Sequence, residues 1–243
     1  MSKQLSKSIT LSVTVEELFQ SGAHIGHKTS HWNPSIKNFL HSSKSNTHII
    51  DLFQSIEQLE AACQAVYSLG KKGQKLLFVG TKSQAAPVLT ALAKEIDAPY
   101  VTKRWPGGLL TNFETISSRL KKLTEMEKTL DDQSLRAKYT KRELGKMEQS
   151  IKKLNTMLGG IKGIKRPPQA VFVVDTNLEK TAVQEATKLG LTTIAIVDTN
   201  SSPKGIDYPI VASDDNLKVI ELIAREIQVA YQTGYREYLT RQK

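Results

Sequence analysis

Apolar residues recur every three or four positions in several parts of the chain, which is the spacing of one helix face. Ile56, Leu59, Cys63 and Val66 show it most clearly and predict a helix over residues 53–69, with Gly70 after its end. The same spacing predicts further helices over residues 83–96, over residues 179–189 and from about Asp214 to Thr233.

A short helix near the start of the chain is predicted from its end signals. Thr14 and Glu17 have the spacing of a capping box, in which each side chain bonds the backbone N–H of the other residue. Gly22 can adopt the left-handed conformation that commonly ends a helix. We therefore expect a helix between Thr14 and Gly22.

Short apolar runs between the helices predict strands. Two of them, AVFVVDTN (170–177) and TIAIVDTN (193–200), are near-repeats that both end in Asp-Thr-Asn. With the helix over residues 179–189 between them and Gly190 after it, they predict a βαβ unit with parallel strands. The other predicted strands cover residues 47–51, 75–80, 99–102 and 208–212.

The alternation of strands and helices predicts an α/β fold. We expect a mostly parallel sheet of about five strands flanked by helices, as in a flavodoxin-like or Rossmann-like sandwich. In such sheets binding sites gather at the carboxyl ends of the strands. Gly80, Asp175 and Asp198 follow predicted strands and are expected at that edge.

Residues 113–158 show two helical stripes whose spacing suits the packing of one helix on another. We interpret them as an antiparallel coiled-coil hairpin that turns at Asp131 to Ser134 and is inserted into a globular domain of residues 1–112 and 159–243. Two helices of ~20 residues, at ~1.5 Å per residue, make an arm ~30 Å long. The stripes consist of Ile116, Leu120, Leu123 and Leu130, and of Leu144, Met147, Ile151, Leu154 and Leu158.

Positive charge is concentrated in the same part of the chain. The net charge is +10, from 34 basic and 24 acidic residues, and residues 116–166 contain 14 of the former and 6 of the latter. Clustered Lys and Arg indicate a polyanionic partner, with a solvated helix face as the alternative. No apolar run approaches the ~20 residues of a membrane span, so no membrane partner is expected. The single cysteine, Cys63, excludes an intrachain disulfide and is expected to be a buried thiol.

The sequence contains no recognisable catalytic motif. VGTK (79–82) lacks the upstream glycine of a Walker loop, and neither PGG (106–108) nor GGIKG (159–163) fits a dinucleotide-binding loop. No Ser/His/Asp grouping can be read from the sequence. We therefore predict no enzyme activity, no catalytic residues and no cofactor.

All five histidines lie between His24 and His48. His24, His27 and His31 have spacings that place metal ligands on one face of a helix, but Gly26 interrupts a helix here. We therefore favour an irregular surface loop in which the histidines pack or form hydrogen bonds.

A less favoured alternative joins His24 or His27 to Asp198, Asp214 and Asp215 around a divalent ion. Imidazole and carboxylate groups are metal ligands. Aspartates at these positions serve equally well as helix caps and loop acceptors, so we assign no metal ligand from the sequence.

Six short motifs occur in one order and at one set of spacings. They are AHIGHKTSHWNP (23–34), HIIDL (48–52), FVGTK (78–82), KRWPGGLLTNFETI (103–116), LGGIK (158–162) and AIVDTN (195–200). Together they resemble the family of small-ribosomal-subunit protein two, in its bacterial and organellar form. The resemblance runs from about Val15 to Thr233, and the hairpin stands where the family has one.

The resemblance implies a structural constituent of the small ribosomal subunit, acting in translation. It also implies binding to small-subunit ribosomal RNA where the head and body of the subunit meet, and help in docking the mRNA-binding ribosomal protein one. Neighbouring ribosomal proteins are implied partners, and no homo-oligomer is expected. The ribosome would be cytoplasmic, or that of a plastid or mitochondrion.

Three positions depart from the family pattern. Pro106 stands where Leu is usual in the Arg-Trp-x-Gly-Gly motif, and Ser83 stands where an Arg often follows Gly-Thr-Lys, which removes one candidate phosphate contact. Asn46 stands where a glycine is common before HIID, and we expect it to take the left-handed conformation of that glycine.

Folded ribosomal RNA offers phosphates and shape more than readable base edges, and Lys and Arg supply affinity by releasing counterions. Trp32 and Trp105 are expected to pack beneath their loops, with stacking on a base as the alternative. The predicted RNA-binding residues are Lys28, Lys37, Lys44, Lys82, Lys103 and Arg104 in the globular loops, Lys121, Lys122, Lys138, Lys141, Arg142, Lys152 and Lys153 in the arm, and Lys162, Lys165 and Arg166 at its base.

Two other functions stay as alternatives. A nucleotide or sugar-phosphate enzyme would bind a small ligand at the strand ends. A coiled-coil adaptor would hold a protein partner on the hairpin.

Overall fold

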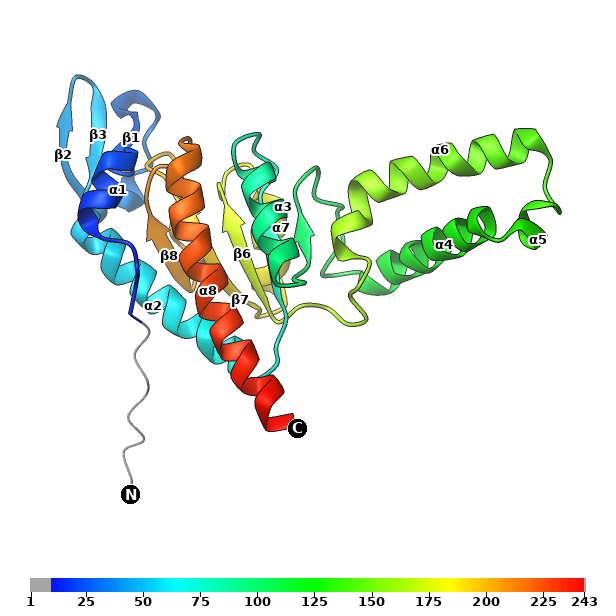
Figure 1. Ribbon diagram of the computed structural model, residues 1–243. Helices are drawn as coiled ribbons and strands as arrows, with labels where there is room; N and C mark the ends of the chain where they lie inside the picture. Colours follow the sequence, from blue (N-terminus) through cyan, green and yellow to red (C-terminus); the bar gives the residue numbers. More distant parts are fainter. Residues whose placement is uncertain (1–9, 243) are drawn as a thin grey trace.

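A five-stranded parallel sheet forms the centre of the computed structural model, which describes residues 10–242 (Figure 1). Its strands are β4 (Leu76–Val79), β5 (Tyr100–Val101), β6 (Ala170–Val174), β7 (Thr192–Val197) and β8 (Tyr208–Val211). They are arranged in the order β5-β4-β6-β7-β8, and every neighbouring pair is parallel. Counted along the chain this is the order 2-1-3-4-5 of flavodoxin-like sheets, so the predicted fold class is confirmed.

Helices cover both faces of the sheet. One face carries α1 (Val15–Ser21), α2 (Leu52–Lys71), α3 (Ala85–Glu95) and α8 (Leu217–Gln242), and the other carries α7 (Lys180–Lys188) and the root of the arm. Leu76 and Phe78 of β4 point into the first core, while Leu77 and Val79 point into the second. Strands buried on both faces read as unbroken apolar runs, which is why the repeats at 170–177 and 193–200 predicted their strands correctly.

The end signals of α1 act as predicted. Thr14 and Glu17 form the capping box, and Gly22 ends the helix with a φ of 84°. Helix α2 was predicted too short, because it continues through Gly70 to Lys71. Helix α8 starts at Leu217, after the predicted start, and extends beyond the predicted end at Thr233.

Gly70 has a packing role in place of the predicted role of a helix end. A Cβ atom at Gly70 would lie 2.5 Å from the Tyr231 carbonyl oxygen, and one at Gly234 would lie 2.1 Å from the Tyr67 carbonyl oxygen. Contacts that short do not occur in packed proteins, so the two glycines allow α2 and α8 to cross at backbone contact.

A second, smaller sheet was missed by the sequence prediction. The segment 23–46, expected to be an irregular loop, forms β1 (Ile25–Lys28) and β2 (Leu40–Lys44), which flank β3 (Thr47–Ile50) in an antiparallel sheet. Only β3 was predicted, because β2 is almost wholly exposed and polar and shows no apolar alternation. Two short 3-10 helices, η1 (Thr29–His31) and η2 (Pro34–Phe39), lie between β1 and β2.

The β2–β3 hairpin turns on Ser45 and Asn46. Both have positive φ angles, 50° and 61°, as a type I′ two-residue turn requires. The expected left-handed conformation of Asn46 is therefore confirmed.

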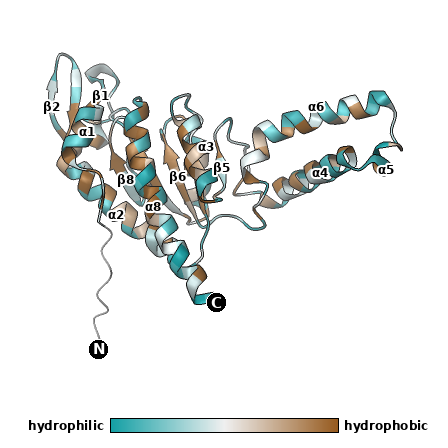
Figure 2. Cartoon of the chain, viewed as in Figure 1, coloured by the Kyte–Doolittle hydropathy of each residue, from teal (hydrophilic) through white to brown (hydrophobic). Residues whose placement is uncertain are grey.

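The arm consists of two long antiparallel helices, α4 (Phe113–Asp131) and α6 (Lys141–Leu158), which project from the globular part (Figure 1). The turn was predicted at Asp131 to Ser134, but α4 includes Asp131, and the connection runs from Asp132 to Thr140 and includes the short helix α5 (Gln133–Arg136). Ile116, Leu120 and Leu158 belong to the core beneath the sheet, so the root of the arm is anchored in the globular part. The sheet strands are hydrophobic in Figure 2, while hydrophilic residues predominate toward the tip of the arm.

Within the described residues, none of the helices combines the length and the apolar character needed to cross a bilayer. Cys63 is fully buried on α2, as predicted, and burial raises the pKa of its thiol far above the ordinary value.

Candidate functional site

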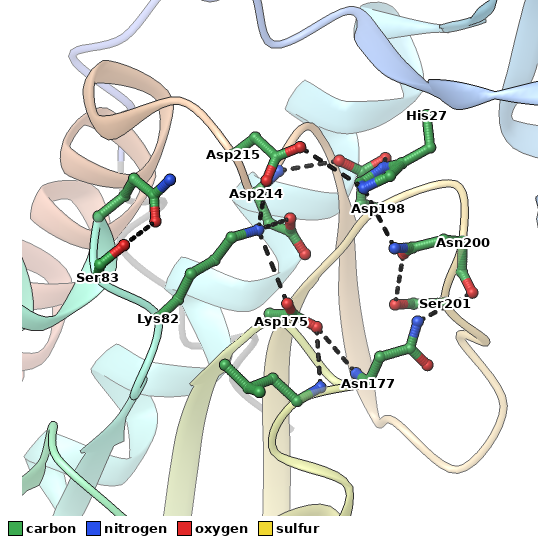
Figure 3. A network of polar contacts seen from close by, with 12 residues as sticks. His27, Lys82, Ser83, Asp175, Asn177, Asp198, Asn200, Ser201, Asp214 and Asp215 are labelled. Atoms are coloured by element: carbon green, nitrogen blue, oxygen red, sulfur yellow. Dashed lines mark hydrogen bonds and ion pairs between the residues drawn. The ribbon is translucent and has the colours of Figure 1, made fainter. Parts of the chain in front are cut away.

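Polar residues from four strand ends meet at the carboxyl edge of the large sheet (Figure 3). Lys82 follows β4, Asp175 follows β6, Asp198 follows β7, and Asp214 with Asp215 follows β8. This is the edge at which parallel α/β sheets build their sites. The predicted location of Asp175 and Asp198 is therefore correct.

Lys82 lies at the centre of this network. Its Nζ atom is 2.5 Å from Asp214 Oδ1, 2.7 Å from Asp215 Oδ1 and 3.7 Å from Asp175 Oδ2. Burial alone lowers the pKa of Lys82, but the hydrogen bonds to Asp214 and Asp215 outweigh it, so its pKa is raised. The ammonium is thus fully charged and held by three carboxylates, an arrangement that the sequence did not indicate.

Asp214 has an unusual environment for a carboxylate. Burial raises its pKa to about 7, with repulsion from Asp198 and Asp175 acting in the same direction and the bond to Lys82 acting against them. Its second oxygen, Oδ2, has no hydrogen-bond partner in the described part of the chain. The pKa of Asp214 is therefore raised, whereas the bond to Lys82 lowers the pKa of Asp215.

His27 connects the small sheet to the network. Its Nδ1 atom lies 3.1 Å from Asp198 Oδ1, and its Nε2 atom lies 3.5 Å from Asp215 Oδ2. The bond to Asp198 raises the pKa of His27, against the opposing effect of burial. The backbone N–H of His27 donates to Thr199 Oγ1 at 2.7 Å. A Cβ atom at Gly26 would lie 2.4 Å from Thr199 Cγ2, so this close approach requires glycine.

Three of these residues could hold a divalent cation. The ligand atoms of His27, Asp198 and Asp215 all lie within 4.8 Å of one another. Asp214, which the sequence placed in the same alternative site, is not in this group, and its Oδ1 atom bonds to Lys82. His24 is not in it either, and its ring stacks on Phe19 with 4.2 Å between the ring centres.

The remaining histidines pack or are exposed, as the favoured reading expected. The His48 ring lies 4.9 Å from the Trp32 ring, centre to centre. His31 and His41 are on the surface. The opening histidine segment is therefore a folded, mostly structural part of the small sheet.

A buried carboxylate on α7 organises the loop that contains the Arg-Trp-Pro-Gly-Gly motif. Glu185 Oε1 accepts from Trp105 Nε1 at 3.0 Å and from the Gly108 N–H at 2.8 Å. Its Oε2 accepts from the N–H groups of Leu110 and Thr111 at 3.0 and 3.1 Å, and from the Thr111 hydroxyl at 3.1 Å. Burial alone raises the pKa of Glu185, but these hydrogen bonds together outweigh it and hold the pKa below its ordinary value.

A second carboxylate at the start of α7 holds the neighbouring loop. Glu179 is 2% exposed and accepts the Thr81 N–H at 2.7 Å, next to Lys82. The sequence analysis missed both carboxylates. The available signal was their helical spacing with Ala182 and Ala186, which places them on the buried side of α7.

All but one of the predicted RNA-binding residues have exposed side chains. Lys82 is the exception, with 15% of its side chain exposed. Lys162 is exposed and pairs with Glu127 at 2.7 Å. Also exposed are Lys28, Lys37, Lys44, Lys103, Arg104, Lys121, Lys122, Lys138, Lys141, Arg142, Lys152, Lys153, Lys165 and Arg166.

Both tryptophans pack beneath their loops, as predicted. Trp32 and Trp105 are half-buried against the core that lies on the α7 side of the sheet. The Trp105 indole is further fixed by its bond to Glu185.

Comparison with known proteins agrees with this architecture over nearly the whole chain. The family model for ribosomal protein S2 matches residues 18–234. Small ribosomal subunit protein uS2c of Cyanidium caldarium is 43% identical over 220 residues, which cover 90% of each chain. Small ribosomal subunit protein uS2 of Rickettsia akari (strain Hartford) is 41% identical over 226 residues, covering 93% of this chain and 77% of the relative.

A relative from a third organism matches as broadly. Small ribosomal subunit protein uS2 of Bifidobacterium adolescentis is 40% identical over 225 residues, covering 93% of this chain and 83% of the relative. The motifs that suggested the family in the sequence lie on the loops at the strand ends, in the small sheet and at the root of the arm. The chain belongs to the ribosomal protein S2 family, and it is a structural protein of the ribosome and not an enzyme.

Proposed function

We propose that this ribosomal protein binds the RNA of the small subunit through exposed basic side chains on its arm and on the loops of its globular part. The observation that carries the proposal is the arm. Residues 116–166 contain 14 basic and 6 acidic residues, and the basic residues predicted to bind RNA there are all exposed.

The packing of the arm explains why its charge faces outward. Ile116, Leu120 and Leu123 are buried and Leu130 is half-buried, so most of the apolar stripe of α4 is already covered. In the adaptor alternative a protein partner would bind the apolar seam of the coiled coil. That seam is already used in packing, so this alternative is disfavoured. The basic residues occupy the other helix faces, where they can release counterions to a phosphate backbone.

Lys82 has a different role in this proposal. Its ammonium already has three carboxylate partners and little exposed surface. We assign to it the positioning of the strand-end loops, and we assign the phosphate contacts to the exposed residues of the predicted set.

We further propose that the end of the molecule near the small sheet docks a protein neighbour, the mRNA-binding ribosomal protein one. Phe19 on α1, Ile25 on β1 and Phe53 at the start of α2 are 58%, 50% and 73% exposed. These elements meet at one end of the molecule, away from the arm (Figure 1). Grouped exposed apolar residues of this kind mark protein interaction surfaces.

Sedimentation of cell extract through sucrose gradients at low and high salt tests the RNA-binding proposal. The wild-type chain is expected to travel with the small subunit and to dissociate as salt rises. The variant Lys138→Glu/Lys141→Glu/Arg142→Glu should dissociate at lower salt. The matched control Lys180→Glu/Lys188→Glu/Lys204→Glu makes the same change in charge at exposed sites outside the predicted set and should behave as wild type.

Two results would contradict the proposal. One is a wild-type chain that stays at the top of the gradient at every salt concentration. The other is equal weakening by the two triple variants, which would show that net charge alone, and not the arm, determines association. Docking of the protein neighbour is tested separately by Phe19→Ser/Phe53→Ser, which should release that neighbour from the subunit while the chain itself stays bound.

A further inference from the structure

A cavity opens at the amino-terminal edge of the large sheet, on the opposite side from the Lys82 network. It lies between the loop before β4, the loop before β5 and residues 160–169, which lead from the arm to β6. Its volume is about 430 Å³, within the range of pockets that enclose a small organic group. The family motifs do not extend into most of this cavity, and the RNA contacts proposed above use only its rim.

The wall of the cavity combines apolar surfaces with positive charge. Ala98, Pro99, Ile164 and Pro167 supply flat apolar surface. The charged residues in the lining are Lys75, Lys165, Arg166 and one acid, Asp97. An apolar hollow with cations at its edge is suited to a flat ring that carries a phosphate group.

The cations at the rim are free to bind an anion. Lys165 and Arg166 are exposed, and neither forms an ion pair with a carboxylate of residues 10–242. Lys162, three residues earlier, does pair with Glu127. Lys75 already has a partner, because its Nζ atom lies over the Tyr235 ring, 5.0 Å from the ring centre.

The cavity is built into the fold. Lys75 and Gln169 are joined by two bonds, from the Lys75 N–H to Gln169 Oε1 at 2.9 Å and from the Gln169 N–H to the Lys75 carbonyl at 3.1 Å. A Cβ atom at Gly160 would lie 2.2 Å from the Tyr100 carbonyl oxygen, so the chain leaving the arm is pressed against β5. A preformed pocket needs no reordering of the protein to bind its ligand.

We propose that this cavity binds one unpaired nucleotide of ribosomal RNA. The base lies against Pro99, Ile164 and Pro167, and the phosphate lies at Lys165 and Arg166. Proteins read RNA largely through unstacked bases splayed out of loops and bulges, with basic residues on the adjoining phosphates. The inference rests on the RNA-binding function proposed above and assigns one site to it.

The binding of short RNA to the full-length chain can be followed by NMR, through the backbone amide signals of the isotope-labelled protein. The probes are the trinucleotides A-A-A and U-U-U, the mononucleotides AMP and UMP, and inorganic phosphate. A trinucleotide is expected to shift the amide signals of Ala98, Gly163 and Ile164 and to saturate. Inorganic phosphate is expected to shift only Lys165 and Arg166, and at higher concentration.

Gly163 allows the cavity to be filled without a change in charge. Gly163 lines the cavity, and a Cβ atom there meets nothing within 4 Å, so Gly163→Phe adds a ring at the cavity wall without a clash at the Cβ atom. This variant should weaken trinucleotide binding at least tenfold. The matched control is Val229→Phe on α8, where the replaced side chain is 48% exposed, and it should bind as wild type. Unchanged amide spectra away from the cavity establish that both variants are folded.

Three results would overturn the inference. They are trinucleotide shifts scattered over the basic surface, equal binding by Gly163→Phe and wild type, and binding of mononucleotides but not of trinucleotides. The last would mean that the cavity takes a free nucleotide with a terminal phosphate. Failure of the cavity assignment is distinguishable from failure of RNA binding as a whole. The Gly163→Phe variant keeps the basic arm, so it should still sediment with the small subunit. A variant that binds no trinucleotide and still sediments in this way supports the assignment.

Discussion

Replacing Glu185 by glutamine tests whether one buried carboxylate holds the Arg-Trp-Pro-Gly-Gly loop in place. Glu185→Gln keeps the shape of the side chain but turns one acceptor oxygen into an NH2 donor. Oε1 faces two donors, from Trp105 and Gly108. Oε2 faces three, from Leu110 and Thr111. Whichever way the amide is oriented, at least two donors therefore lose their acceptor.

The magnitude follows from that count. Hydrogen bonds to a charged group contribute about 1.5–3 kcal/mol each. Two lost bonds therefore predict that Glu185→Gln lowers the free energy of unfolding by about 3–6 kcal/mol, when native domains have about 5–15 kcal/mol in total. Glu221→Gln is the control, because it makes the same chemical change at an exposed position of α8 and should cost less than about 0.5 kcal/mol.

The assay is urea unfolding followed by tryptophan fluorescence and circular dichroism, as a function of pH. The hydrogen bonds lower the folded-state pKa of Glu185, so its contribution is complete above the unfolded pKa of about 4.3 and is lost as the pH falls through the folded value. The difference between wild type and Glu185→Gln should therefore be constant near neutral pH and shrink below about pH 4. A difference under 0.5 kcal/mol at pH 7, or one that persists undiminished to pH 2, would refute the reasoning.

Three further predictions concern other contacts. Because the folded-state pKa of Asp214 is raised to about 7, its contribution to stability should fall as pH rises from about 4 to 7, and Asp214→Asn should flatten that slope in unfolding measurements. Gly26→Ala should destabilise by more than about 1 kcal/mol because of the contact with Thr199, and the cost should shrink in a Thr199→Ser background in a double-mutant cycle. Gly234→Ala should lower the free energy of unfolding by about 2 kcal/mol or more, because the new methyl group would clash with the Tyr67 carbonyl oxygen. Urea unfolding measures this change. A change near zero would mean that α2 and α8 separate easily.

The sequence predicted best where local pattern and burial agree. The strands β6 and β7 are buried on both faces, so their apolar runs and their Asp-Thr-Asn ends were visible without any knowledge of partners. The helices of the arm were visible because each carries its own periodic stripe, and their bounds of Phe113–Asp131 and Lys141–Leu158 lie within the predicted span of residues 113–158.

The sequence could not predict contacts between distant residues of mixed polarity. Strand β2 owes its existence to pairing with β3, and its own residues, LHSSK, carry no strand signal. Lys82 was taken for an RNA contact because a lysine in a loop is ordinarily solvated, and its three aspartate partners lie 93 to 133 positions away along the chain. Glu185 was overlooked because its donors are mostly backbone N–H groups, which every sequence contains.

Two carboxylates of the α7 segment each hold a different loop at the end of a strand. Glu179 holds the loop after β4, and Glu185 holds the loop after β5. A shift of this one helix along its axis would move both loops at once. The positions of the two loops therefore cannot change independently as the sequences of the family diverge. Substitutions in either loop should then be accompanied, among relatives, by compensating changes on the buried side of α7. Helix α7 is therefore the place to look for coupled substitutions that involve the two loops.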